Sequence, residues 1–128
     1  VLAIVTGEGS SGGALGLGVA NHILMLENAV YSVLSPDGFA SILWKDASRS
    51  GEACTMMKLT AQDLYADGIV EEIIPEPLGG AQRGRQLLFS RLDTAIAAHL
   101  AALCKMSGKA LADQRYKKYR RIGEMRGA

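Results

Sequence analysis

Cysteine is scarce in this sequence. Cys54 and Cys104 are the two in 128 residues, and neither belongs to a Cys-x-x-Cys pair. Two isolated cysteines cannot build the disulfide framework of a small secreted domain or a zinc cluster, so we expect a reducing, cytoplasmic setting and no metal site in this chain. No uninterrupted apolar run reaches the roughly 18 residues that a membrane-spanning helix needs, so no membrane is expected as a partner.

Targeting signals are also missing. A signal peptide begins with a basic region and ends in a cleavage motif, and the first residues here contain neither. The first residue is Val rather than Met, and residues 1–6 already have the composition of a buried strand. We therefore expect the chain to begin inside a fold, as part of a longer protein.

Apolar residues make up 48% of the chain, which suffices for the core of one domain and excludes wholesale disorder. Apolar runs predict strands at residues 1–6, 23–26, 29–34 and 69–74. Helical spacing and capping signals predict helices at residues 12–20, 36–44, 46–57, 60–67 and 86–104, and a glycine-serine loop at 7–13. Ser35 is the expected N-cap before Pro36, and Thr60 and Asp63 are expected to cap each other's backbone amides.

Positive charge is concentrated at the C-terminal end. Residues 105–128 hold eight of the fourteen Lys and Arg residues, Arg126 among them, but only two of the thirteen Asp and Glu residues. Such a tail could meet phosphates or an acidic partner, but charge runs are usually the solvated face of a helix. We expect the solvated helix, and nucleic acid is not an expected partner.

The glycine-rich segment at residues 7–13 (GEGSSGG) is the main candidate for chemistry, because it follows a strand and opens a helix. Gly7, Gly9 and Gly12 match the Gly-x-Gly-x-x-Gly spacing of dinucleotide sites, and Glu27 stands where a ribose-binding acid is expected. A second strand follows at once, however, where a dinucleotide-binding unit needs a crossover helix.

A serine hydrolase is the second hypothesis for this segment. Gly9, Ser11 and Gly13 match the Gly-x-Ser-x-Gly turn that exposes a nucleophilic serine between a strand and a helix. His99 lies downstream as a possible base, but it falls on the apolar stripe of a helix, where a packed histidine is expected. His22 has no obvious carboxylate partner in the sequence.

The third hypothesis uses the backbone alone. The amides of Gly12 and Gly13, in the first turn of the helix, would form an oxyanion hole for a developing negative charge. Loss of one such donor typically costs about 2.7–4 kcal/mol of transition-state stabilisation. The competing structural explanation is close packing, in which Gly9, Gly13 and Gly16 admit a near neighbour.

Longer stretches of the sequence resemble one known family. They are residues 7–15 (GEGSSGGAL), 25–33 (MLENAVYSV), 35–38 (SPDG), 42–45 (ILWK), 59–61 (LTA) and 73–81 (IIPEPLGGA). These segments resemble the alpha subunit of the acetyl-CoA carboxylase carboxyltransferase. The resemblance runs from residue 1 to about residue 83, and the helix and basic tail after it agree in character.

This resemblance implies an α/β fold of the ClpP/crotonase type, built from stacked ββα units. Residues 1–83 would be the C-terminal part of that core, and residues 84–128 a long amphipathic helix and a basic helical tail. The implied reaction is the carboxyltransferase half-reaction of acetyl-CoA carboxylase, which moves the carboxyl group of carboxybiotin to acetyl-CoA and gives malonyl-CoA for fatty-acid biosynthesis.

The resemblance also implies partners and site residues. Biotin would arrive on a separate carrier protein, biotin carboxylase would perform the ATP-dependent step, and a zinc-bearing beta subunit would complete an alpha2beta2 assembly. The oxyanion glycines of the family correspond to Gly12 and Gly13. The carboxybiotin side of the pocket would be formed by Gly9, Ser11, Tyr31, Ser35, Pro36 and Gly38.

Two departures from the family are evident. Ser10 stands where the family usually has Gly, and the N-terminal portion of the family's core is absent, so the fragment by itself is expected to be inactive. Other readings stay open at this point: another crotonase-family acyl-CoA enzyme, such as a decarboxylase or a propionyl-CoA carboxyltransferase, a non-catalytic module that binds the beta subunit, or the Ser11 hydrolase.

Overall fold

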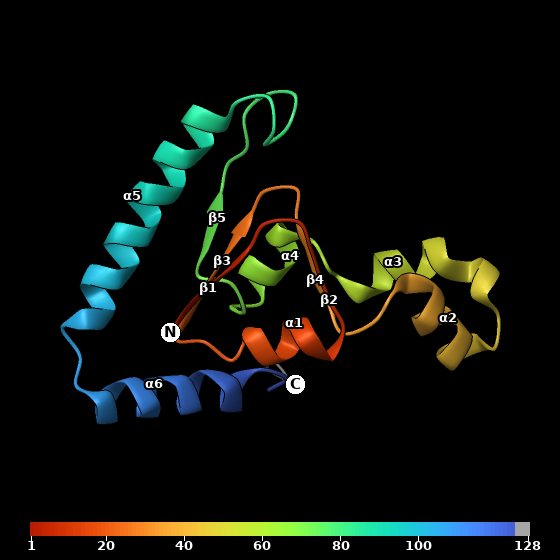
Figure 1. The fold of residues 1–128 in the computed structure, drawn as a ribbon. Coiled ribbons are helices and arrows are strands. Elements are labelled where there is room, and N and C mark those ends of the chain that lie inside the picture. The colour runs from red at the N-terminus through yellow and green to blue at the C-terminus, as the bar shows by residue number, and fades with distance from the viewer. Residues whose placement is uncertain (125–128) are drawn as a thin grey trace.

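Two parallel sheets form the centre of the protein, which is described over residues 1–124 by a computed structural model (Figure 1). Strands β1 (Leu2–Val5), β3 (His22–Leu26) and β5 (Glu72–Ile74) form one sheet in the order β1-β3-β5. Strands β2 (Glu8–Ser10) and β4 (Val30–Ser32) form the other. All of these pairings are parallel. Each chain crossing between neighbouring strands therefore needs an intervening segment, which helices supply.

The strands and helices follow a repeated ββα order. β1 and β2 lead into α1 (Ser11–Leu17), and β3 and β4 lead into α2 (Pro36–Trp44). A 3-10 turn at Ala47–Arg49, α3 (Ser50–Met57) and α4 (Ala61–Ala66) follow before β5. The expected α/β class with ββα units is confirmed, and two such units stack side by side through the two sheets.

The core is built around β3, the middle strand of the three-stranded sheet. Ile23, Leu24, Met25 and Leu26 are all buried. A parallel strand between two neighbours is covered on both faces, which explains why this segment is a continuous apolar run rather than an alternating one. Residues of α4 and α5 (Arg85–Cys104) complete the core: Ala61, Leu64, Leu88 and Ala95.

Several boundaries differ from the sequence-based expectation: the helix expected at 12–20 ends at Leu17, and the strand expected at 29–34 is limited to Val30–Ser32. Residues 8–10 were expected in a loop, but they form β2, because their backbone pairs with β4 in the register Glu8↔Val30 to Ser10↔Ser32. The strand expected at 69–74 is limited to Glu72–Ile74. The amides of Ile69 and Val70 instead bond to the Leu64 carbonyl and continue the turn that ends α4.

The expected helix caps are largely confirmed. Ser35 Oγ accepts a hydrogen bond from the Gly38 amide at 3.2 Å, and Pro36 is the first residue of α2. Thr60 Oγ1 accepts one from the Asp63 amide at 3.3 Å. The reciprocal half of that capping box is different: the Asp63 carboxylate accepts from the Thr60 hydroxyl at 2.7 Å.

The long helix α5 matches the helix expected at 86–104. Its length and mean hydropathy would suffice for a membrane crossing. The sequence-based expectation was different because Arg85, Arg91 and Asp93 break its apolar run. These two properties are weak evidence for a membrane helix, because the core helix of a soluble protein can share them. One side of α5 does pack inward, with Leu88, Ala95 and Leu103 buried.

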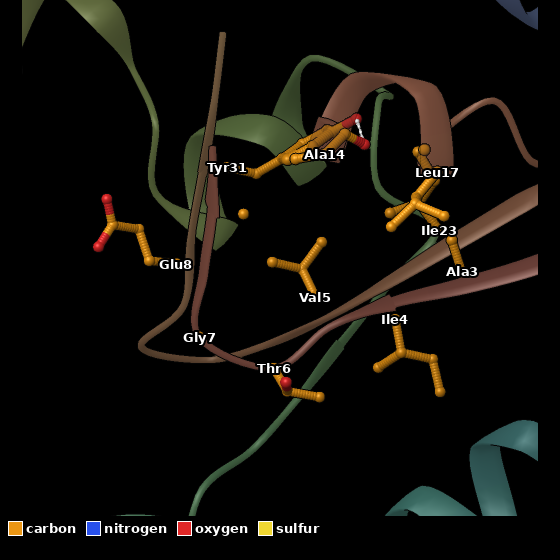
Figure 2. A pocket seen from close by; sticks show the side chains of 12 residues that line it. Ala3, Ile4, Val5, Thr6, Gly7, Glu8, Ala14, Leu17, Ile23 and Tyr31 are labelled. Atoms are coloured by element: carbon orange, nitrogen blue, oxygen red, sulfur yellow. Dashed lines mark hydrogen bonds between the residues drawn. The ribbon is translucent and has the colours of Figure 1, made fainter. Parts of the chain in front are cut away.

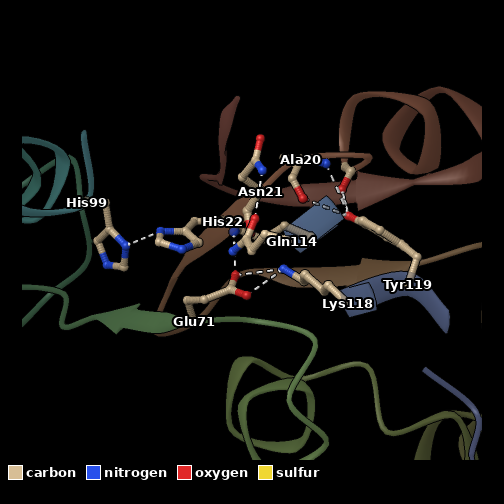
Figure 3. A network of polar contacts seen from close by, with 10 residues as sticks. Ala20, Asn21, His22, Glu71, His99, Gln114, Lys118 and Tyr119 are labelled. Carbon is tan, nitrogen blue, oxygen red and sulfur yellow. Dashed lines mark hydrogen bonds and ion pairs between the residues drawn. The ribbon is translucent and has the colours of Figure 1, made fainter. Parts of the chain in front are cut away.

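The basic tail forms helix α6 (Gly108–Arg121), but it is not simply a solvated face. Lys118 is buried and forms an ion pair with Glu71, and the Asn21 side chain donates a hydrogen bond to Gln114 (Figure 3). The Asn21 side chain also donates to the Leu111 carbonyl. One side of the helix therefore docks on the core, because its long side chains find partners at the start of β3 and β5. Arg126 lies outside the described residues.

Candidate functional site

The parallel pairing of β2 with β4 brings two predicted site segments to one end of the small sheet. Ser10, the last residue of β2, stands beside Ser32, the last residue of β4. Strand β2 continues directly into α1, and three residues separate the end of β4 from the start of α2. Both helices therefore start from the same edge (Figure 1). Helix N-termini carry partial positive charge, so this edge favours an anionic group.

The first turn of α1 presents backbone amides to solvent. Helix geometry leaves the first N–H groups without acceptors inside the helix, and the Ser10 side chain makes no capping hydrogen bond. Gly12 and Gly13 are exposed, and a methyl group built on either would meet no atom within 4 Å. Two exposed first-turn amides without a capping side chain are available to an oxyanion.

Ser11 has an unusual backbone conformation. Its φ of 68° lies in the left-handed region, which is uncommon for a residue other than glycine. This agrees with the sharp strand-to-helix turn of a nucleophilic serine. Among the described residues, however, no hydrogen bond joins Ser11 to a histidine, and the N-terminal end of α1 lies on the side away from α5, which carries His99 (Figure 1).

The two histidines contact each other instead. His22 Nδ1 and His99 Nδ1 are 2.8 Å apart (Figure 3). His99 Nε2 is 2.8 Å from Glu72 Oε2. Burial lowers the pKa of His22, the nearby His99 and Lys118 lower it further, and Glu71 opposes them. The chain His22–His99–Glu72 ties α5 to the starts of β3 and β5. We assign it a structural role, as expected for His99.

Of Gly9, Gly13 and Gly16, which were expected to admit a close neighbour, only Gly9 does so. Gly13 and Gly16 have open space around them. Gly9 is closely packed, since a methyl group there would lie 3.0 Å from Tyr31 Cδ2 and 3.1 Å from Val5 Cγ1. Gly18 was not predicted, and a methyl group there would overlap the Tyr31 hydroxyl.

Tyr31 lies beneath α1, in a cavity of about 270 Å³ between β1, β2 and that helix (Figure 2). Its hydroxyl donates to the Ala14 carbonyl at 3.3 Å, and burial raises its pKa. The cavity is mostly apolar and is lined by Ala3, Ile4, Val5, Thr6, Gly7, Glu8, Gly9, Ala14, Leu17, Gly18, Ile23 and Tyr31. It therefore lies under the C-terminal half of α1, whereas Gly12 and Gly13 belong to the N-terminal half of the helix.

The dinucleotide hypothesis does not fit the structure. Gly9 belongs to a strand and not to a phosphate-binding loop. The Glu27 carboxylate, the candidate for ribose, accepts a hydrogen bond from the Glu76 amide at 3.0 Å and so joins the end of β3 to the segment after β5. Within residues 1–124, no three His, Cys, Asp or Glu side chains gather as a metal site.

Comparisons with known proteins agree on one family. The model described as acetyl co-enzyme A carboxylase carboxyltransferase-like matches residues 1–123. The acetyl-coenzyme A carboxylase carboxyl transferase subunit alpha of Methylobacterium sp. (strain 4-46) is 53% identical over 122 residues, 95% of this chain and 38% of that protein. The subunit from Geobacillus thermodenitrificans (strain NG80-2) is 51% identical over 125 residues, 98% of this chain and 38% of that protein.

A third relative and one solved structure complete the comparison. The same subunit of Staphylococcus carnosus (strain TM300) is 49% identical over 126 residues, 98% of this chain and 40% of that protein. The chain thus spans about two fifths of the length of these curated relatives. The crystal structure of transcarboxylase 12S aligns with 75% of this chain and 20% of its own, at a TM-score of 0.47 and 19% identity.

Proposed function

The chain belongs to the acetyl-CoA carboxylase carboxyltransferase family, and from this premise we propose that it carries one half of a carboxyltransferase active site. The protein of which it forms part moves the carboxyl group of carboxybiotin to acetyl-CoA, giving malonyl-CoA for fatty-acid biosynthesis in the cytoplasm. One observation carries the proposal: Gly12 and Gly13 lie exposed in the first turn of α1, where no side chain caps the backbone amides.

The two glycines act through their backbone. Their amides donate hydrogen bonds to the ureido oxygen of biotin, on which negative charge develops as the carboxyl group leaves. Fixed dipoles aimed at a developing charge stabilise the transition state more than the ground state. The residues present fit the group, because Gly12 and Gly13 are exposed and no protein atom lies within 4 Å of where their side chains would begin. Carboxybiotin supplies the carboxyl group.

Neighbouring residues shape the same edge. Ser35 Oγ caps α2 through the Gly38 amide, and this first turn follows β4 at the edge of the small sheet where α1 follows β2. We assign this turn and Ser11 to the carboxybiotin side of the pocket. Gly9 and Tyr31 support the pocket from within, because both lie under α1.

The remaining components belong to other chains. We assign the carrier of biotin, the ATP-dependent biotin carboxylase and the thioester-binding beta subunit with its zinc to separate proteins, with two copies each of alpha and beta in the transferase. A role limited to assembly is the second candidate. The exposed apolar side chains of Leu87, Phe89 and Leu100 on α5 favour it, since such side chains are typical of protein contacts.

The proposal is tested with Gly13→Val in the full-length subunit, assembled with its partner. The valine Cβ would meet no protein atom within 4 Å, so the substitution adds bulk next to the amides without a clash at that atom. We expect kcat for malonyl-CoA formation to fall about 100-fold or more, the range seen when an oxyanion donor is lost. Assembly, measured by size-exclusion chromatography with light scattering, should be unchanged.

Gly16→Val is the matched control. Gly16 lies in the same helix and is also exposed and surrounded by open space, but it is outside the first turn. This variant should keep most of the wild-type rate. Full activity of Gly13→Val with normal assembly would refute the amide role and leave the assembly module.

A further inference from the structure

Helix α1 lacks the features that would fix its orientation by itself. It has seven residues, contains Gly12, Gly13 and Gly16, buries none of its side chains and has no side-chain cap at Ser10. Short helices rich in glycine are marginal without tertiary contacts. The direction of its first-turn amides must therefore be set by groups outside the helix.

Two tyrosine hydroxyls, from distant parts of the chain, bond to the backbone at and just after the C-terminal end of α1. Tyr119, on α6, donates to the Gly18 carbonyl and accepts a hydrogen bond from the Ala20 amide at 3.1 Å (Figure 3). Tyr31, on β4, donates to the Ala14 carbonyl, which also accepts from the Gly18 amide at 2.8 Å. Gly18 is buried between the two tyrosines, and any side chain at this position would overlap Tyr31.

We propose that Tyr119 and Tyr31 are positioning residues that clamp the C-terminal end of α1 and so aim the amides of Gly12 and Gly13. The inference rests on the proposed function, which makes those amides the reacting contacts. It gives α6, which lies almost a hundred residues further along the chain, a role in the site.

The length of the helix explains why the clamp matters. Gly12 and Gly18 are separated by about 9 Å at 1.5 Å per residue, so a tilt of about 10° at the Gly18 end moves Gly12 by roughly 1.5 Å. A displacement of about 1 Å at a reacting centre can reduce the rate about 100-fold. A lost hydroxyl at the far end of α1 is thus expected to act on turnover.

The test uses Tyr119→Phe and Tyr31→Phe in the full-length subunit assembled with its partner. Each variant keeps the ring and removes the hydroxyl. We expect kcat for carboxyl transfer to fall about 10-fold or more, with KM for acetyl-CoA changed less than about 3-fold, because the substrate contacts themselves remain. Tyr116→Phe is the control, since Tyr116 is exposed on the same helix and should leave kcat unchanged.

Hydrogen exchange provides a readout that does not depend on activity. The amides of residues 15–18 should exchange faster in both clamp variants than in the wild type, while those of α3 should not change. A variant with a lower melting temperature but unchanged kcat and unchanged exchange in α1 would overturn the clamp. If the tyrosine variants and Gly13→Val all kept their activity, the proposed function itself would fail. If Gly13→Val were inactive while both tyrosine variants stayed active, only the clamp would be refuted.

Discussion

At the scale of single residues, Ser11 shows how one position supports two functional hypotheses. Its left-handed backbone conformation is a strained feature of the kind that accompanies functional sites. A nucleophilic serine also needs a base within hydrogen-bond reach. The described histidines bond to each other and to Glu72, so Ser11 is better explained as the residue that turns the chain sharply from β2 into α1.

Replacement of Ser11 by alanine separates these explanations. We expect Ser11→Ala to retain carboxyl transfer within about 5-fold of the wild-type rate, because the amides of Gly12 and Gly13 stay in place and no covalent step through the serine is needed. The rate of malonyl-CoA formation by the assembled enzyme measures this. Complete loss of transfer with intact assembly would restore the hydrolase-like role of the serine.

At the scale of elements, helix α5 is attached to the sheet partly by a titratable link. His22 on β3 contacts His99 on α5, and His99 contacts Glu72 on β5. Neutral rings suit this chain, because one Nδ1 must donate while the other accepts. Two protonated rings would place two N–H groups against each other and would weaken the attachment.

Acidification should therefore destabilise the protein. Burial lowers the pKa of His22 in the folded state, so the unfolded chain binds more protons below about pH 6.5, its usual pKa. Stability from this group is complete above that pH and is lost as the pH falls towards the folded-state pKa. We expect the melting temperature of the full-length subunit to be lower at pH 5.5 than at pH 7.5.

The control for this pH dependence is His22→Gln, which cannot titrate. The difference in melting temperature between the two pH values should shrink in the variant. An unchanged difference would assign the effect to other groups.

At the scale of the whole molecule, α6 closes the fold by contacts that span most of the sequence. Lys118 Nζ lies 2.6 Å from Glu71 Oε1, and Glu71 Oε2 accepts a hydrogen bond from the Ile23 amide at 2.6 Å. Tyr119 reaches Gly18, which is 101 residues away in the sequence. The C-terminal helix is thus joined to β3, to β5 and to the end of α1 at once.

The buried ion pair should contribute measurably to stability. We expect Lys118→Met to lower the free energy of unfolding of the full-length subunit by about 1–3 kcal/mol, because Glu71 would lose its charged partner in a half-buried position. Chemical denaturation measures this change. Lys117→Met removes an exposed lysine from the same turn and should stay within about 0.5 kcal/mol of the wild type. Equal effects of the two substitutions would contradict the docked arrangement of α6.

Local features were determined by the sequence itself. The apolar run at 23–26 specified the central strand, Ser35 and Pro36 specified the start of α2, and the long helix was found almost to the residue. Gly12 and Gly13 could be singled out because a strand, two glycines and a helix start follow one another directly. These signals act over a few residues, through periodicity, capping and backbone freedom, so they can be read without knowledge of the fold.

Tertiary structure alone decided the rest. Residues 8–10 became a strand because β4 offers a parallel partner at the right register, and Gly18 had to be glycine because Tyr31 passes over it. Tyr116 and Tyr119 both lie in the basic tail of the sequence. Only the packing of α6 against the core shows that Tyr119 faces inward and Tyr116 faces solvent. Such contacts join residues far apart in the sequence, and their selection depends on the register and packing of the whole chain, which no short segment encodes.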